Sequence, residues 1–536
     1  MRKADVEHLL SWNYSLTGPS PAGCYAAVVL ATYLPSAFAL SLGFLALLPG
    51  VRNNPSVVVT FLVAAVVFVL WNTLLLRPGR KLSLEITVRK QHYIQACAQG
   101  TVLLYWGWYW PPVYASLHLI LAQLLFAYAL DMLLCWSRRD TYVLGFAPFP
   151  IIFSINLFLW FKPDWFYLQF AIVALGLVAR EFIRWNKDGR SAHIFNPSSF
   201  PLAIAAAVLL VTGKTDLTWG PEIATTQFFS PHIYLVLFLV GLPGQFLFGV
   251  TLMTMSAVLT TYAFGLVYYA TSGIYFFYDS YIPIAVFLGM HLLFTDPSTS
   301  PQTEAGRVIF GVLYGLSTVA LYQVLGMAGM PTFYDKLLQV PILNLSIKAI
   351  DRFCAWSRDV RVLNRRRHFA FMSVWAIAFA VMSAMQGVGD AHPGQWLPFW
   401  RQACDDGRPY ACPYLADLQL DYCYDGSGWA CNEAGLQHIA LANSGEDLRR
   451  KDPAGAADPF RYGCELGFRA ACRNLTTLTE SGELVGASPS LKDYAIVLKG
   501  SKREVRDRTP ASLYTLACNQ GWPDACELAI FSGLQK

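Results

Sequence analysis

Cys404-Asp-Asp-Gly-Arg-Pro-Tyr-Ala-Cys412 is the first of four copies of one pattern, Cys-x-x-Gly-x-x-x-Ala-Cys, near the end of the chain. The other copies span residues 423–431, 464–472 and 518–526. In one continuous helix, residues i and i+8 lie about 12 Å apart along the axis, which is too far for a bond. The central glycine can adopt the left-handed conformation that ends one helix before the next begins. Each copy therefore predicts a helical hairpin closed by a local disulfide.

The four copies contain eight of the 12 cysteines of the chain, all paired at one spacing: Cys404 with Cys412, Cys423 with Cys431, Cys464 with Cys472, and Cys518 with Cys526. Cysteine pairs can also bind zinc, but zinc sites usually separate the two cysteines by two to four residues, and here seven intervene. We therefore favour disulfides and predict no metal site. Disulfides persist in oxidising compartments, so the C-terminal region is predicted to lie outside the cytoplasm.

The remainder of the chain has the composition of a membrane protein. Of its 536 residues 55% are hydrophobic and 14% charged, and the mean hydropathy is +0.39. Soluble domains carry about 25% charged residues. Apolar runs of about 17–25 residues, the length that spans a bilayer, follow one another between residues 24 and 390. The net charge of +5 lies in short loops and does not indicate nucleic-acid binding.

These runs predict an all-α fold: a polytopic bundle of about thirteen transmembrane helices, followed by a disulfide-bonded domain of helical hairpins. The predicted domains are a cytoplasmic N-terminus (residues 1–23), the transmembrane bundle (24–390) and an extracytoplasmic repeat domain (391–536). The predicted spans have these approximate limits: 24–49, 57–76, 92–110, 111–136, 142–161, 164–182, 196–212, 232–248, 251–271, 280–295, 307–328, 333–350 and 368–388.

Basic residues set the predicted orientation. They gather in five short segments: residues 2–3, 77–90, 138–139, 180–190 and 358–367. With thirteen spans all five segments fall on one side, which the positive-inside rule makes cytoplasmic. One further helix then carries the chain outward before the paired cysteines begin. Loop charge and thiol chemistry thus agree on a protein of the bacterial inner membrane with a periplasmic C-terminal domain.

Two polar stretches interrupt the apolar pattern, at residues 187–200 and 294–307. Asn196-Pro197 opens the predicted span 196–212, and an Asn cap followed by proline is a common start of a helix with no further function. Thr295-Asp296-Pro297 begins the second stretch, where prolines and hydroxyl side chains are also typical of a turn. Polar groups near membrane depth are nevertheless candidates for a functional site.

Taken together, the two stretches resemble the RnfD/NqrB family, the flavin-carrying membrane subunits of ion-translocating electron-transfer complexes. The resemblance covers roughly residues 85–355. It is carried by these residues: Asn196, Pro197, Thr295, Asp296, Pro297, Thr299, Gly306 and Arg307. It implies that these residues contribute to cofactor binding in a bundle that passes electrons across the membrane together with other redox subunits.

In that family one flavin mononucleotide is esterified to a threonine in a Ser-x-Ala-Thr-like motif outside the bundle. The matching interval here keeps Ala224-Thr225 and lacks the preceding serine. Thr225 is therefore the candidate for covalent attachment. A flavin bound without a covalent bond, or a quinone, remains the alternative carrier.

The C-terminal region resembles a cysteine-bearing form of the Sel1-like repeat, a relative of the tetratricopeptide array. Repeat arrays present a concave face suited to partners, which predicts a module that docks a soluble extracytoplasmic protein. Two functions follow. The first is a membrane redox subunit that carries flavin or quinone, with the repeats docking a donor or acceptor. The second is a non-redox membrane scaffold that has lost its flavin anchor and presents the repeats to other proteins.

Overall fold

The computed structural model describes most of the chain up to residue 480. The described residues are 11–14, 32–76, 80, 82–110, 112–187, 189–220, 223, 226–227, 232–273, 275–277, 280–357, 365–386, 397–405, 407, 411–424, 428–447, 450–466 and 469–480. The fourth predicted disulfide, between Cys518 and Cys526, and the flavin candidate Thr225 lie outside them.

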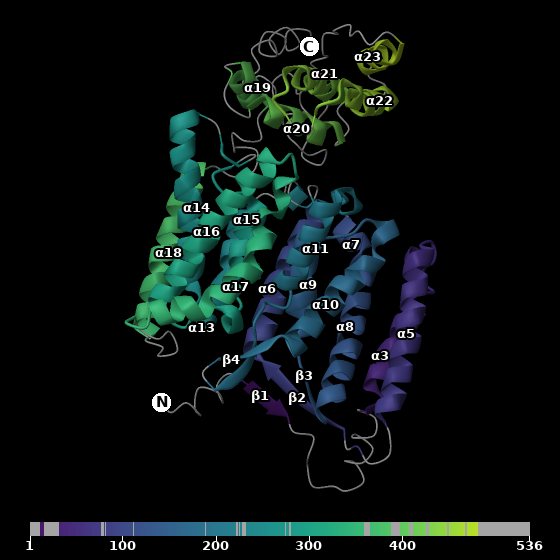
Figure 1. Ribbon diagram of the computed structural model, residues 1–536, viewed down its shortest axis with the longest axis vertical. Helices are drawn as coiled ribbons and strands as arrows, with labels where there is room; N and C mark the ends of the chain where they lie inside the picture. Colours follow the sequence, from purple (N-terminus) through teal and green to yellow (C-terminus); the bar gives the residue numbers. More distant parts are fainter. Residues whose placement is uncertain are drawn as a thin grey trace, which may run out of the picture. The chain divides into compact units, whose positions relative to one another are not determined.

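Every one of the thirteen predicted apolar segments contains a helix (Figure 1). The helices are α3 (Leu34–Leu45), α4 (Pro49–Arg52), α5 (Pro55–Leu75), α6 (Lys90–Tyr109), α7 (Pro112–Ala115), α8 (Leu117–Arg138), α9 (Pro148–Phe158), α10 (Tyr167–Phe182), α11 (Ser199–Thr212), α13 (Ile233–Phe248), α14 (Thr251–Ser272), α15 (Ile284–Leu288) with a π-helical turn (Gly289–Leu293), α16 (Glu304–Met327), α17 (Asp335–Phe353) and α18 (Arg365–Gln386). The helical fold class is thereby confirmed.

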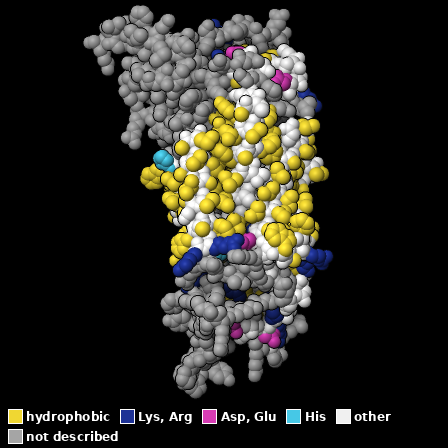
Figure 2. Space-filling view, turned by 90° about the vertical axis from the view of Figure 1, so that its left-hand side faces the viewer, with side chains coloured by type: hydrophobic (Ala, Val, Ile, Leu, Met, Phe, Trp, Pro, Cys, Tyr) yellow, Lys and Arg dark blue, Asp and Glu magenta, His cyan; other side chains and the backbone are white. Residues whose placement is uncertain are grey.

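Five of the described helices, α5, α8, α14, α16 and α18, are long and apolar enough to cross a membrane. The chain is a multi-pass membrane protein on this basis, while the count of thirteen spans stays a prediction. Exposed apolar side chains run along α18, as lipid contact requires: Phe369, Val374, Ile377, Val381 and Met385. Figure 2 shows a face on which hydrophobic side chains form a continuous band with Lys and Arg at one border.

The chain divides into two compact units. The first unit comprises residues 1–260, 284–321 and 333–376. Within it α8 is the central helix, because most of its side chains are buried, whereas those of α5 largely face outward. Helix α3 packs against α5 and α8, α6 lies against α9 and α13, and α11 packs against α10 and α17.

Five short strands, which the sequence analysis did not predict, lie at one end of the helices of the first unit (Figure 1). Strands β1 (Ser11–Tyr14), β2 (Ser83–Arg89) and β3 (Thr141–Leu144) form one sheet, with β1 antiparallel and β3 parallel to β2. Strands β4 (Arg184–Lys187) and β5 (Arg190–His193) form a hairpin. Gly145 follows β3 where only glycine fits, since a Cβ there would lie 2.5 Å from the carbonyl oxygen of Thr87. The sheet connects the end of α8 to the start of α6.

The second unit contains the disulfide-bonded hairpins. Its described helices after residue 396 are α19 (Leu397–Asp405), α20 (Ala411–Tyr424), α21 (Gly428–Ser444), α22 (Ala457–Glu465) and α23 (Arg469–Glu480). Three predicted disulfides are present, at Cys404–Cys412, Cys423–Cys431 and Cys464–Cys472, with Cα–Cα distances of 4.6, 4.5 and 4.6 Å. Gly407 has a φ of 66°, the left-handed turn that the pattern predicted.

The hairpins stack in sequence order, because α20 packs on α21, α21 on α22, and α22 on α23. The same unit includes residues 261–283, 322–332 and 377–386. The Tyr414 hydroxyl donates to the carbonyl oxygen of Phe276 (2.9 Å) and lies 3.2 Å from the Tyr322 hydroxyl of α16. The Trp400 ring meets Tyr414 edge-on at 5.2 Å. The first hairpin therefore contacts Tyr322 of the membrane helix α16 and Phe276, which follows α14.

Replacing Cys464 and Cys472 by serine removes the bond between α22 and α23. Because the loop between them is then unconstrained in the unfolded chain, we expect the second unit to lose about 2–3 kcal/mol of stability. Thermal unfolding of the full chain in detergent measures this loss. Cys97→Ser is the control, since Cys97 is an exposed free cysteine. Ready alkylation of Cys464 in unreduced wild-type protein would contradict the bond.

Candidate functional site

A cavity of about 350 Å³ lies inside the first unit. Its wall is formed by residues of strands β2 to β5, of helices α6, α8, α9 and α10, of the π-helical turn and of the neighbouring loops. Its charged and titratable lining residues are Arg89, His92, Asp131, Cys135, Arg139, Tyr142, Arg180, Glu181, Arg184, His193 and Asp296. So polar a wall is unusual in a membrane bundle, where ionisable side chains mark functional sites by default.

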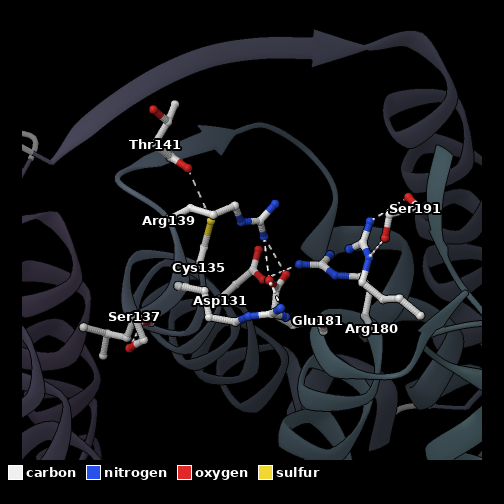
Figure 3. Close-up of polar contacts among 11 residues, drawn as sticks. Asp131, Cys135, Ser137, Arg139, Thr141, Arg180, Glu181 and Ser191 are labelled. Carbon is white, nitrogen blue, oxygen red and sulfur yellow. Dashed lines mark hydrogen bonds and ion pairs between the residues drawn. The ribbon is translucent and has the colours of Figure 1, made fainter. Parts of the chain in front are cut away.

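An ion pair between Asp131 of α8 and Arg180 of α10 forms part of this wall (Figure 3). The Asp131 side chain is only 8% exposed and that of Arg180 19%. The Tyr142 hydroxyl donates to the second carboxylate oxygen of Asp131 at 2.9 Å. Asp131 thus pairs with an arginine of the neighbouring helix α10, and not with Arg138 and Arg139 at the end of its own helix.

Arg138 and Arg139 form ion pairs with the carboxylate of Glu181. One Arg139 nitrogen donates to both Glu181 oxygens, at 2.7 and 2.6 Å, and Arg138 donates to the Glu181 carbonyl oxygen at 2.8 Å. Figure 3 shows Arg139 and Arg180 reaching toward the two acids from different helices. Glu181 is buried, whereas the Arg139 side chain is 52% exposed, so this pair lies where the cavity meets solvent.

Three of the five basic segments of the sequence meet here. Arg80 of the second segment pairs with Asp140 (2.7 Å), the residue directly after the third segment. The arginines of that third segment, Arg138 and Arg139, pair with Glu181 of the fourth. Contacts between these segments place them at one end of the first unit, as the positive-inside interpretation requires.

The two predicted polar stretches come together at the cavity wall. Nε2 of His193 lies 3.2 Å from an Asp296 carboxylate oxygen, and the Ser298 backbone N–H donates to the other oxygen at 2.9 Å. Burial by itself would raise the pKa of Asp296. The hydrogen bond and charge of His193, together with the Ser298 N–H, bring that pKa below its ordinary value of 3.8.

Asn196 forms a second link between the two polar stretches, beside the contact of His193 with Asp296. Its side-chain oxygen accepts from the backbone N–H groups of Ser198 (2.9 Å) and Ser199 (3.0 Å), so it satisfies the turn that leads into α11, whose N-cap residue is Ser198. Its amide nitrogen donates to the carbonyl oxygen of Leu293, two residues before Thr295 (2.9 Å). Asn344 of α17 completes the junction, accepting from the Asn196 N–H at 3.2 Å and donating to the carbonyl oxygen of Thr299 at 3.2 Å.

The structure brings four of the predicted site residues to the cavity, namely Asn196, Pro197, Asp296 and Pro297. Thr299 is buried behind them and donates to Asp296 at 3.3 Å.

The remaining predicted residues that are described lie elsewhere. Thr295 lines a separate small cavity. Gly306 packs closely against Pro301 and Thr303. Arg307 is buried and donates to the carbonyl oxygens of Pro301 (2.9 Å) and Phe248 (3.0 Å), so it stabilises the end of α13.

Sequence reasoning missed Arg180, Glu181, Tyr142 and His193 as parts of one site. A signal was available for the first two, because adjacent opposite charges end an otherwise apolar run at residues 164–182. Nothing in the sequence indicated their partners. Among the described residues, no group of three or more His, Cys, Asp or Glu could hold a metal ion.

No family model, curated protein or solved structure matches this chain. The resemblance to the RnfD/NqrB family stays a prediction from the sequence motifs.

Asp131→Asn leaves Arg180 without its counter-charge inside the first unit. Removing one partner of a buried ion pair is costly, so we expect a loss of about 3 kcal/mol in stability. Asp140→Asn is the matched control, because its pair with Arg80 is exposed and should contribute less than about 1 kcal/mol. Thermal unfolding in detergent compares the two. Equal losses would show that the Asp131 pair does not hold α8 to α10.

The lowered pKa of Asp296 predicts an acid-dependent loss of stability. Because the folded state binds this proton more weakly than the unfolded chain, the carboxylate stabilises the fold above the unfolded pKa, at about 4. The contribution is lost as pH falls through the folded pKa. Wild type should therefore lose more stability than Asp296→Asn between about pH 5 and pH 3. The exposed Asp164→Asn should follow wild type, and parallel curves for wild type and Asp296→Asn would contradict the assignment.

Proposed function

We propose that this protein is the membrane subunit of an electron-transfer complex and binds a flavin in the cavity of the first unit. The observation that carries the proposal is the junction of the two polar stretches. Asn196 and Asp296 lie 100 positions apart in the sequence, and both line the same cavity. Residues that the family resemblance assigns to a cofactor thus gather around a space that can accept one.

The cavity fits a flavin in size and chemistry. Its volume lies within the range of small-molecule sites, about 300–1,000 Å³. Arg89, Arg139 and Arg184 contribute to its wall, and guanidinium groups suit a phosphate. The buried Gln99 amide donates to the Ser154 hydroxyl at 2.7 Å, while its side-chain oxygen has no hydrogen-bond partner within the described part of the chain. That oxygen is available to accept from an N–H of a bound ring.

A bound flavin would supply the electron carrier, since its ring accepts and releases one or two electrons. The residues of this chain would bind and orient it. Arg89 and Arg184 would hold the phosphate, and Gln99 the ring. The ion pairs Asp131–Arg180 and Glu181–Arg139 would keep the surrounding helices in place.

A second carrier position is supported at the other end of α6. Four tryptophans cluster there, with Trp106 stacked on Trp110 at 5.0 Å and both near Trp160 (5.9 and 5.8 Å). Trp219 meets Trp110 at 6.4 Å. The Trp106 ring nitrogen donates to the Thr226 hydroxyl at 3.2 Å, directly beside the predicted attachment residue Thr225. A flavin or quinone at this end would give electrons a path across the bundle.

The remaining parts of the proposal concern topology and partners. The end with the arginine pairs would face the bacterial cytoplasm, and the disulfide-bonded hairpins would face the periplasm. There they would dock a soluble donor or acceptor, and other membrane redox subunits would complete the complex and couple it to ion transport. Three disulfides and the clustered basic segments support this orientation.

The decisive experiment is purification of the full chain in detergent from flavin-replete cells, followed by absorbance, fluorescence and mass spectrometry. We expect bound flavin. Arg184→Gln should weaken its retention about tenfold or more, because a hydrogen bond to a charged group contributes about 1.5–3 kcal/mol. Arg52→Gln, at the end of α4 and away from the cavity, should retain flavin as wild type does.

Protein that is folded and colourless would contradict the redox proposal and favour the non-redox scaffold. The contacts of Tyr414 with Tyr322 of α16 and with Phe276, which follows α14, support that second function, since they hold the first hairpin of the repeat array beside a membrane helix.

A further inference from the structure

A second, much smaller cavity lies beside the first, between α6, α13 and the π-helical turn after α15. Its volume is about 20 Å³, enough for one water molecule. Gln95 and Leu292 line both cavities, so the two spaces adjoin. Its polar lining residues are Gln95, Gln245, His291 and Thr295, and no charged side chain is among those described around it.

Three buried polar atoms at this cavity have no hydrogen-bond partner among the residues that the structure describes. They are Nε2 of His291 and both side-chain polar atoms of Gln245. His291 is 2% exposed and Gln245 1% exposed. Buried polar groups are nearly always satisfied, by protein or by ordered water. A cavity of this size, lined by three polar atoms whose hydrogen bonds are not satisfied by the described protein atoms, is therefore a site for water.

Two of the three helical elements that line the cavity, α13 and the turn after α15, are irregular where they meet it. Residues Gly289–Leu293 form a π-helical turn, a feature that is frequent at functional sites. Opposite this turn, α13 carries Pro243 in its interior. Gly241 of α13 keeps the space open, because a Cβ there would lie 3.2 Å from Cδ2 of His291 and 3.3 Å from Nε2 of Gln245. Interrupted membrane helices of this kind mark binding sites in transporters.

The hydrogen bonding of His291 determines which of its nitrogens is free. Nδ1 lies 2.8 Å from the carbonyl oxygen of Phe287, which can only accept, so Nδ1 carries the hydrogen. In the neutral ring Nε2 then presents a lone pair toward the small cavity. The rings of Phe287 (4.0 Å) and Trp375 (6.0 Å) pack on the imidazole and offer no competing proton acceptor.

We propose that the small cavity holds a water molecule through which His291 exchanges protons with the large cavity, by way of Gln95. A proton supplied by solvent in the large cavity adds to the lone pair of Nε2 and gives an imidazolium. The Nδ1–H bond to Phe287 is retained, and the proton leaves by the same route. Only an N–H bond forms and breaks, so no oxidant or reductant is needed. The titratable groups along the route are those of the large cavity, and His92, His193 and Asp296 come from the elements nearest Gln95.

Hydrogen–deuterium exchange at the imidazole Cε1–H, followed by mass spectrometry of the full chain in detergent, tests the proposal. The rate for a histidine in contact with water rises with pH along a titration curve, and a sealed histidine shows no such curve. We expect a titration curve for His291 despite its burial. Absence of any pH-dependent exchange at His291 in folded protein overturns the proposal.

Two variants test the route. Gly241→Ala places a methyl group at His291 and Gln245, and Gln95→Leu closes the side shared with the large cavity. Each should slow or abolish exchange at His291. Gly43→Ala is the matched control, because its Cβ would make only an ordinary contact with Ala65, 3.5 Å away. Unchanged exchange in both folded variants would contradict the route. The result does not depend on flavin, so it is separable from failure of the proposed function.

Discussion

The ion pair between Asp131 and Arg180 is the interaction on which the first unit depends most. A carboxylate inside a membrane bundle is stable only with a counter-charge and hydrogen bonds that replace water. Arg180 and Tyr142 provide both, and they come from α10 and β3. The pair therefore joins the central helix α8 to its neighbour and to the small sheet. Glu181 repeats the arrangement closer to solvent with Arg138 and Arg139.

The large cavity lies beside this ion pair, and both Asp131 and Arg180 contribute to its polar wall. The junction of Asn196, Asn344 and Thr299 closes one wall, because each backbone group there needs a partner where water is scarce. Two features that support a bundle of helices, paired charges and capped helix ends, thereby create a space that can bind a small molecule.

The stability of the second unit depends on its disulfides. Its hairpins are short, and a few helices bury little apolar surface. Local disulfides compensate by restricting the unfolded chain, and each of the three described bonds joins two consecutive helices. Phe460, buried between Ala456 and Ala471, is the center of a small apolar core in the last described hairpin. Such a unit needs an oxidising compartment, which relates its fold to the topology of the helices that precede it.

The sequence alone determined the properties that depend on local pattern. Apolar run length indicated every long helix of the bundle, and the cysteine spacing indicated the three described hairpins with their disulfides, because both signals lie within a few turns of chain. It also identified Asn196 and Asp296 as unusual polar positions. Only the tertiary structure decided which charges meet. Asp131 pairs with Arg180 and not with Arg138, and β2 pairs with β1 and β3. Both outcomes depend on segments that are distant in sequence and that packing brings together.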